Sequence, residues 1–338
     1  MSAPRAQKAV RVPTKKIVGI VLLGVALYFG FAVYGGLAKV GAELAHFAWW
    51  TFGVACILAF CNYCLRYLKW EFYLARLEIR GVPKVDSFLM FLAGFILTIT
   101  PGKVGEVFKS VVLYDLEGVP VERTAPIVVA ERLTDLIGII VLIVAGSLGF
   151  AGGLGWAAFG SALVLSMLVV VSSKTLSHGI LRLIAKIPGP IGRLAPKLDH
   201  AYESLSILVA PKNLILPALL SIVAWSFECL ALWIVLGGFG VAVSPLASAF
   251  FYATSTLAGA LAPGGLGVTE ASLQAQLVEI AHAGKGVSVA AILLVRFATL
   301  WFAVLVGFGA LAVLRRRHPT LFAGEAPPTE GDAPALQS

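Results

Sequence analysis

The chain has 338 residues, of which 59% are hydrophobic and 13% are charged, whereas soluble domains are about 45–50% apolar and about 25% charged. A water-soluble globular protein is therefore excluded. The net charge of +8 would suggest nucleic acid for a soluble protein, but in a membrane protein it marks cytoplasmic segments, so we expect a polytopic membrane protein that binds no nucleic acid.

The first elements are a basic N-terminus and two apolar segments. Residues 1–16 are basic and are predicted to be cytoplasmic. The segments 17–37 and 49–68 are each about 20 residues long, which is enough to cross a bilayer core of about 30 Å. The first is not followed by a convincing small-residue cleavage site, so we expect it to be retained as a helix.

The next apolar segment is broken. Residues 86–99 are too few for a comfortable crossing, and the apolar pattern is interrupted at Thr100-Pro101-Gly102-Lys103-Val104-Gly105 before it resumes to about residue 114. Proline and glycine are the strongest local interruptions of a helix. We therefore predict a re-entrant hairpin of two short helices over 85–114.

Four further segments follow. Residues 125–150 and 156–172 are predicted to be spans, with glycines between them. Residues 174–212 are more polar and are predicted to be a cytoplasmic connector with interface-lying pieces such as 181–187. Residues 214–236 are predicted to be another span.

The last part of the apolar region repeats the broken pattern. A short helix over 246–261 is interrupted at Ala262-Pro263-Gly264-Gly265-Leu266-Gly267 and resumes to residue 283, which predicts a second hairpin over 246–283. A final span covers 287–314. The tail, 315–338, is rich in Pro, Glu and Ala and is predicted to be disordered and cytoplasmic.

The two broken segments indicate an internal repeat. Each Pro-Gly break is followed by an arginine inside an apolar helix, Arg132 in 125–150 and Arg296 in 287–314. With six crossings, both termini and most basic residues lie on the cytoplasmic side. The two hairpins then enter from opposite sides, so we expect an all-α fold of about six transmembrane helices and two re-entrant hairpins in an inverted repeat, typical of transporters.

Charged residues inside the spans are the candidate functional residues. Each would be costly against lipid, so we expect them to face inward and pair. Arg132 and Asp135 are three apart on a helix and can meet, whereas Glu228 has no local partner, and a distant arginine such as Arg296 or Arg132 is a hypothesis. Ion pairs that hold the two repeats together are the alternative. The predicted polar path consists of Glu106, Glu131, Asp135, Glu228 and Glu270.

The breaks themselves are candidate anion sites. Each half-helix after a break points its N-terminus into the membrane, where its N–H groups can bind a phosphate. Glycines that only permit close helix crossing are the alternative. The predicted substrate-binding residues are Lys103, Arg132, Arg296, Gly102, Gly105, Gly264, Gly265 and Gly267.

A basic and aromatic stretch follows the second span. Arg66, Lys69 and Trp70 are typical of an ordinary positive-inside anchor with an aromatic belt, or of a surface that recruits lipid headgroups at the cytoplasmic leaflet. The four cysteines lie in apolar runs, and the five histidines have no metal-ligand spacing. We therefore expect no metal site and no cofactor.

Three motifs resemble one known family. Thr100–Glu106, Glu131-Arg132-Leu133-Thr134-Asp135 and Ala262–Glu270 occur in the same order in the flippase-like family, also called the lysylphosphatidylglycerol synthase transmembrane region family. The resemblance covers roughly residues 15–315 of the chain. It implies a bacterial or archaeal inner-membrane protein, similar to the half of multiple peptide resistance factors that moves lysyl-phosphatidylglycerol between leaflets.

The resemblance also frames the functional hypotheses. The tail after Arg317 is too short for an aminoacyl-transferase domain, so we expect no synthesis of the lysyl lipid. The leading hypothesis is a flippase for a phospholipid or related amphiphile, with membrane lipid as substrate. The alternatives are an intramembrane enzyme that modifies lipid headgroups, with Glu106 or Glu270 as general base, and an accessory subunit of an envelope-lipid pathway such as that of hopanoids. No nucleophile with a neighbouring base supports the enzyme, and lipid-synthesis enzymes or a second copy of the chain remain open as partners.

Overall fold

The structure is a computed structural model that describes residues 14–100, 105–148, 155, 158, 162, 203–260 and 262–319. Within these residues every regular element is a helix, which confirms the predicted all-α class. The predicted span 156–172, apart from residues 158 and 162, and the amphipathic piece 181–187 lie outside the described residues.

Three helices of the described part are long and apolar enough to cross a membrane. They are α3 (Trp49–Arg76), α11 (Pro211–Gly238) and the continuous run of α14 (Lys285–Arg296), the π-helical η5 (Phe297–Trp301) and α15 (Phe302–Arg317). They coincide with three of the predicted spans. The helix α3 continues eight residues past the predicted end at Leu68, because its last turns pack inside the protein.

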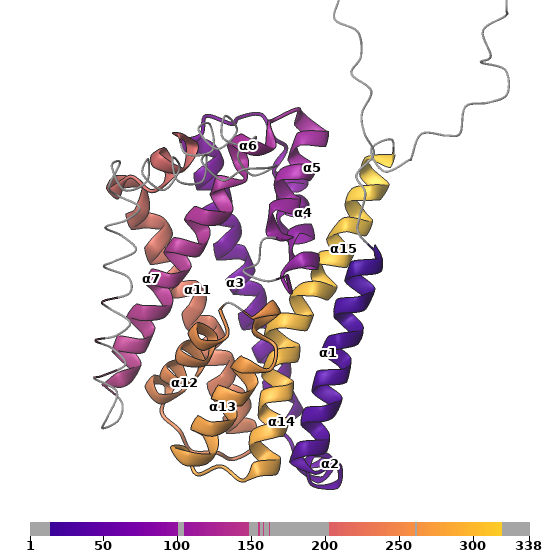
Figure 1. Cartoon of the computed structure of the whole chain (residues 1–338), viewed down its shortest axis with the longest axis vertical. Helices are drawn as coiled ribbons and strands as arrows, with labels where there is room; N and C mark the ends of the chain where they lie inside the picture. Colours follow the sequence, from indigo (N-terminus) through magenta and orange to yellow (C-terminus); the bar gives the residue numbers. More distant parts are fainter. Residues whose placement is uncertain are drawn as a thin grey trace, which may run out of the picture.

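Three more helices complete the frame of the bundle. They are α1 (Thr14–Gly35), the short α2 (Leu37–Ala45) and α7 (Pro126–Ser147). In Figure 1 α1 and α7 run along the long axis of the molecule, and α2 lies at the end where α14 begins. Helix α11 packs against α3 and α7, and α14 packs against α1 and α2.

The remaining helices are short and come in two antiparallel pairs. The first pair is α4 (Lys84–Ala93), extended by η1 (Gly94–Leu97), and α5 (Phe108–Glu117), which the short α6 (Val121–Thr124) follows. The second is α12 (Pro245–Ala258) and α13 (Val268–Glu279), with η4 (Pro263–Gly265) between them. The α-helix therefore ends at both predicted Pro-Gly breaks. Figure 1 shows the two pairs in opposite halves of the molecule, with their tips toward its middle.

The two tips touch each other. A Cβ atom on Gly264 would lie 3.1 Å from Ile99 of the first pair, and Gly264 has a φ of 61°, a left-handed conformation that favours glycine. Ile99 and Leu266 share one buried apolar cluster with Tyr28 and Trp301. Ile99, just before the first break, is thus packed against the second break.

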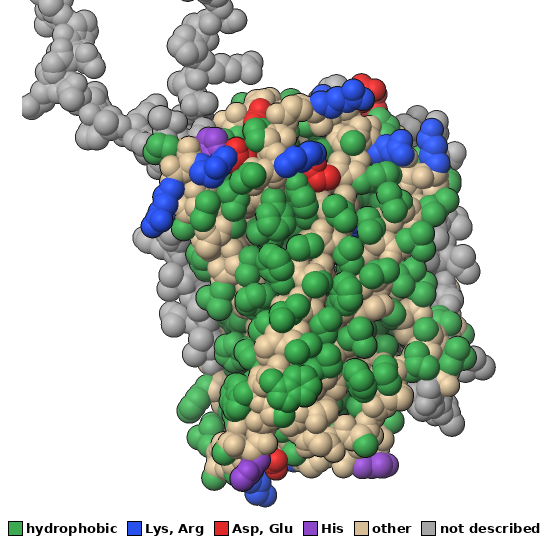
Figure 2. Space-filling view, turned by 180° about the vertical axis from the view of Figure 1, so that it is seen from behind, with side chains coloured by type: hydrophobic (Ala, Val, Ile, Leu, Met, Phe, Trp, Pro, Cys, Tyr) green, Lys and Arg blue, Asp and Glu red, His purple; other side chains and the backbone are tan. Residues whose placement is uncertain are grey.

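The outer surface of the molecule is suited to an apolar environment. Hydrophobic side chains cover the middle of the face in Figure 2, and charged side chains gather at its two ends. Large apolar residues such as Trp50, Ile215 and Leu305 are more than 60% exposed. Monomeric soluble proteins rarely expose apolar patches of this extent, so the surface supports a membrane location.

Candidate functional site

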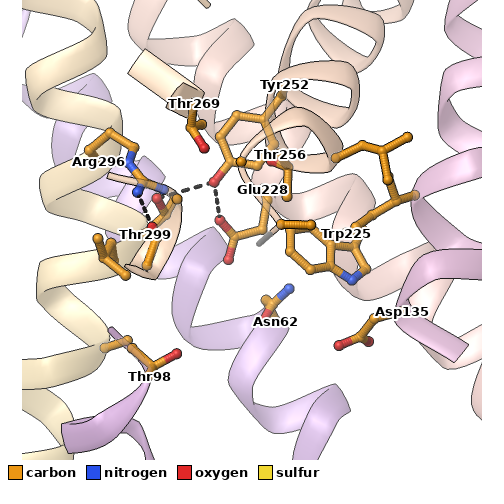
Figure 3. A pocket seen from close by; sticks show the side chains of 18 of the residues that line it. Asn62, Thr98, Asp135, Trp225, Glu228, Tyr252, Thr256, Thr269, Arg296 and Thr299 are labelled. Carbon is orange, nitrogen blue, oxygen red and sulfur yellow. Dashed lines mark hydrogen bonds between the residues drawn. The ribbon is translucent and has the colours of Figure 1, made fainter. Parts of the chain in front are cut away.

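A cavity of about 280 Å³ lies where the tips of the two helical pairs meet α3, α7 and α11. Figure 3 shows polar side chains from several helices around it. Three arginines (Arg66, Arg132 and Arg296) and two acids (Asp135 and Glu228) line it, together with Gly264 and Gly265 of the second break. The other side chains with polar atoms that line the cavity are Asn62, Tyr63, Thr98, Trp225, Tyr252, Thr256, Thr269 and Thr299.

Glu106 holds two of the arginines. Its Oε2 lies 3.3 Å from Nη2 of Arg66 and 3.2 Å from Nη2 of Arg132. Thr98 donates a hydrogen bond to its Oε1 at 3.3 Å. Glu106 itself is buried and does not line the cavity. Glu106 therefore positions Arg66 of α3 and Arg132 of α7 without lining the cavity itself.

Arg132 is the most accessible of the three arginines. Its side chain is 23% exposed, compared with 7% for Arg66 and 8% for Arg296. Its second ion pair, to Asp135 Oδ2 at 2.9 Å, spans three residues of α7, which confirms the predicted contact. The Nε atoms of Arg66 and Arg132 are buried without a hydrogen-bond partner among the described residues.

Asp135 is shared between the cavity and a buried lysine. Nζ of Lys69 lies 2.6 Å from Asp135 Oδ1 and donates to the Ser221 hydroxyl at 2.7 Å. The Ser221 hydroxyl is also 3.1 Å from Asp135 Oδ1. These contacts join α3, α7 and α11, and they satisfy an ammonium group that is completely buried.

Arg296 anchors the second break. Its Nε lies 2.7 Å from Glu270 Oε1, and its Nη2 donates to the carbonyl oxygen of Gly264 at 2.6 Å. Glu270 also accepts hydrogen bonds from the Tyr28 hydroxyl and from the backbone N–H of Gly267, at 3.1 and 2.6 Å. Arg296 therefore satisfies backbone that the break would leave without a partner, while part of its guanidinium faces the cavity.

Besides Glu106, two more acids of the predicted polar path are part of the packing and do not line the cavity. Glu131 is bound by Nζ of Lys109 at 2.6 and 2.8 Å, in an ion pair that is almost fully buried. Glu270 forms an ion pair with Arg296 and does not line the cavity. By contrast Asp135 and Glu228 do line the cavity. Glu228 accepts a hydrogen bond from the Tyr252 hydroxyl, at 2.8 Å.

The predicted glycines divide into two groups. Gly264 and Gly265 line the cavity, whereas Gly105 and Gly267 do not. Gly105 is required for packing, because a Cβ there would lie 2.4 Å from Leu97. Gly102 and Lys103 lie outside the described residues.

The prediction of an exposed headgroup-recruiting surface is wrong. Arg66, Lys69 and Trp70 are buried in α3, with 6%, 0% and 0% of their area exposed. Glu106 and Asp135 neutralise the two bases, and Nζ of Lys109 lies 4.6 Å from the Trp70 ring. The same burial corrects the predicted topology at one point, since Arg66 and Lys69 belong to the interior and not to a cytoplasmic loop.

The N-terminus of α13 differs from the predicted anion site. Glu270 is the third residue of α13, and its own carboxylate accepts from Gly267 N–H. A carboxylate of the chain thus complements the positive end of α13. Glu106 stands two residues before the start of α5.

Sequence reasoning missed Tyr252 and Thr299. The Tyr252 hydroxyl lies 2.8 Å from Glu228 and 3.2 Å from Thr299 Oγ1, as the dashed lines in Figure 3 show. Tyr252 follows two phenylalanines, so its local pattern indicates aromatic packing. The only sequence signal was a hydroxyl in each of two apolar helices.

Fold and site together define an all-helical membrane protein with a buried charged cavity between two broken helices. The chain belongs to the family of the lysylphosphatidylglycerol synthase TM region, whose sequence profile matches residues 16–307. This confirms the resemblance seen in the sequence and relates the chain to membrane proteins of lipid modification and lipid flipping. No curated protein matches the chain.

Proposed function

We propose that the protein is a transporter that moves a phospholipid or related amphiphile between the leaflets of the cytoplasmic membrane of a bacterium or archaeon. The observation that carries this proposal is the cavity at which two broken helices from opposite halves of the molecule meet, lined by three arginines. A site between oppositely directed broken helices is the arrangement that alternating access requires.

The proposed topology has six crossings, two re-entrant hairpins and an inverted repeat. Two corresponding ion pairs, one in each proposed repeat, support this topology. Glu106 binds Arg132 and Glu270 binds Arg296, and each pair spans 26 residues. Glu106 stands two residues before α5 and Glu270 is the third residue of α13, and each arginine lies on the following long helix.

Charge distribution supports an orientation with both termini in the cytoplasm. Arg315–Arg317 end α15, and Arg123 lies in α6 at the same end of the molecule. Lys39 and Lys285 lie at the other end, in α2 and at the start of α14. More basic residues at one end mark the cytoplasmic side.

The cavity chemistry favours an anionic or zwitterionic headgroup. Arginine binds phosphate through a fork of N–H groups, and Arg66, Arg132 and Arg296 present this group from three different helices. The volume, about 280 Å³, is below the roughly 300–1,000 Å³ of pockets that enclose drug-sized ligands. The cavity therefore accommodates a headgroup while the acyl chains stay in the bilayer.

The test is leaflet exchange of labelled phospholipids in vesicles that contain the purified protein. Replacing Arg132 and Arg296 together by Ala should abolish exchange. Because Arg296 also anchors Gly264 and Glu270, the Arg296→Lys variant keeps a charge and should slow exchange without unfolding the site. The exposed Arg316→Ala variant is the control.

The outcomes separate the three hypotheses. Unchanged exchange in the Arg132→Ala, Arg296→Ala double variant would refute the assigned roles. A new lipid product found by mass spectrometry would favour the enzyme. Absence of exchange for every lipid, with lipid-synthesis proteins that copurify, would favour the accessory subunit.

A further inference from the structure

Glu228 occupies an unusual place among the buried charges. It lies in the second half of α11, whose other charged residue is Lys212 in the first turn. Its area is only 6% exposed, yet its carboxyl group lines the cavity. An ionised carboxylate in such a place is costly, so its protonation state depends on the contacts that it makes.

One contact of Glu228 begins a chain of oxygen atoms. Glu228 Oε2 lies 2.8 Å from the Tyr252 hydroxyl, which lies 3.2 Å from Thr299 Oγ1, and that oxygen lies 2.8 Å from the carbonyl oxygen of Val295. All of these distances are within hydrogen-bonding range. Each contact needs one proton between its two oxygens.

The number of protons available to these three contacts depends on the protonation state of Glu228. Tyr252 and Thr299 each supply one hydroxyl proton, and the Val295 carbonyl supplies none. Two protons cannot serve three contacts. When Glu228 carries a proton, it donates to Tyr252, which donates to Thr299, which donates to Val295, and every contact is a hydrogen bond. When Glu228 is ionised, Tyr252 donates to it, and one of the remaining contacts is lost.

Charged and titratable groups surround Glu228 on every packed helix. Tyr63 and Arg66 of α3 interact with it electrostatically, and Cys229 is its neighbour in α11. The groups that line the same cavity from α7, α12 and α14 are Arg132, Asp135, Tyr252 and Arg296. The arginines favour the ionised carboxylate, and an anion bound to them would offset their charge and favour the proton.

We propose that Glu228 is a proton-binding site of the transport cycle, which takes up a proton when an anionic headgroup enters the cavity and releases it when the headgroup leaves. The inference rests on the proposed transport function. The proton comes from the aqueous phase and returns to it, and the carboxyl group only changes between its two protonation states. By linkage, the proton and the anion then raise each other's affinity.

The first test is infrared spectroscopy of the purified full chain in nanodiscs of phosphatidylcholine and phosphatidylglycerol at neutral pH. The difference spectrum of wild type minus Glu228→Gln should contain the carbonyl band of a protonated carboxylic acid. In the Tyr252→Phe background this band should shift, because Glu228 loses its acceptor. The exposed Glu279→Gln variant should show carboxylate bands only. Carboxylate bands alone for Glu228 would overturn the inference.

The second test is leaflet exchange of labelled phosphatidylglycerol in proteoliposomes with and without a pH gradient. We expect the gradient to change the wild-type rate and the Glu228→Gln variant to lose this dependence. If the wild-type rate of exchange does not depend on the pH gradient, the proton-binding role of Glu228 is overturned, whereas the proposed transport function is not affected. Absence of exchange for any lipid, beside an intact infrared band, would instead refute the proposed transport.

Discussion

Lys109 and Glu131 form an ion pair outside the cavity lining, with only 2% and 1% of their side chains exposed. Removing one partner of a buried pair leaves an uncompensated charge and costs about 3–5 kcal/mol, whereas apolar replacement of both is often neutral. We therefore expect Lys109→Met to lower the free energy of unfolding by about 3–5 kcal/mol. Adding Glu131→Leu should restore most of it, as measured by denaturant titration in mixed micelles.

Leaflet exchange is the control measurement for the variants of Lys109 and Glu131. Because neither residue lines the cavity, the stable double variant should retain leaflet exchange. Lys84→Met is the matched surface change, since the Lys84 side chain pairs with Glu71 and is 78% exposed. It should alter stability by less than about 1 kcal/mol. If the double variant is stable but lacks exchange, Glu131 is part of the polar path.

Individual contacts were predictable only where they are local. The pair of Arg132 and Asp135 follows from their spacing on one helix. Arg66 and Glu106 are 40 residues apart, on different helices, and their contact depends on how the bundle packs. For the same reason Arg66 was predicted at the surface, since a charge at the end of an apolar run has the same local pattern whether it meets water or a buried carboxylate.

At the scale of elements, the first hairpin depends on a close approach at Gly105. A Cβ atom there would lie 2.4 Å from the Leu97 side chain and 2.6 Å from its carbonyl oxygen. The backbone cannot yield as a flexible side chain would, and overpacking typically costs about 1–3 kcal/mol. We expect Gly105→Ala to destabilise the protein by about this amount and to slow exchange, because η1 carries part of the cavity wall.

Gly53→Ala is the matched control for that variant. Gly53 lies inside α3, and its added Cβ would meet nothing within 4 Å. Alanine is the better helix former by about 1 kcal/mol, so stability should stay unchanged or increase. Equal losses in both variants would show that the Gly105 contact is not specific. Thermal unfolding in detergent measures both.

The helices could be predicted from the sequence better than the contacts between them. The α-helix ends before both Pro-Gly segments, at Ala93 and at Ala258, as expected because proline and glycine interrupt a helix. The end of α3 was predicted eight residues too early, at Leu68, because Lys69, Trp70 and Tyr73 are buried in the bundle and stay helical. The hydrogen-bonded chain from Glu228 to Val295 joins α11, α12 and η5, and no pattern within one segment indicates it.

At the scale of the whole molecule, the proposed orientation has a direct test. Lys39 and Arg316 are exposed at opposite ends of the bundle. In a chain whose four cysteines have been replaced, we expect a membrane-impermeant maleimide to label the Lys39→Cys variant in intact cells. The Arg316→Cys variant should react only after the membrane is opened, because the more basic end faces the cytoplasm.

The labelling result also decides how each hairpin faces the membrane. If Lys39 is outside, α12 and α13 extend from the outer side and α4 and α5 from the cytoplasmic side, since the two pairs lie in opposite halves of the molecule. The cavity between their tips would then be reachable alternately from either side by small movements of one hairpin. The reversed labelling pattern would invert this assignment, and labelling of both variants from one side would contradict the proposed crossings.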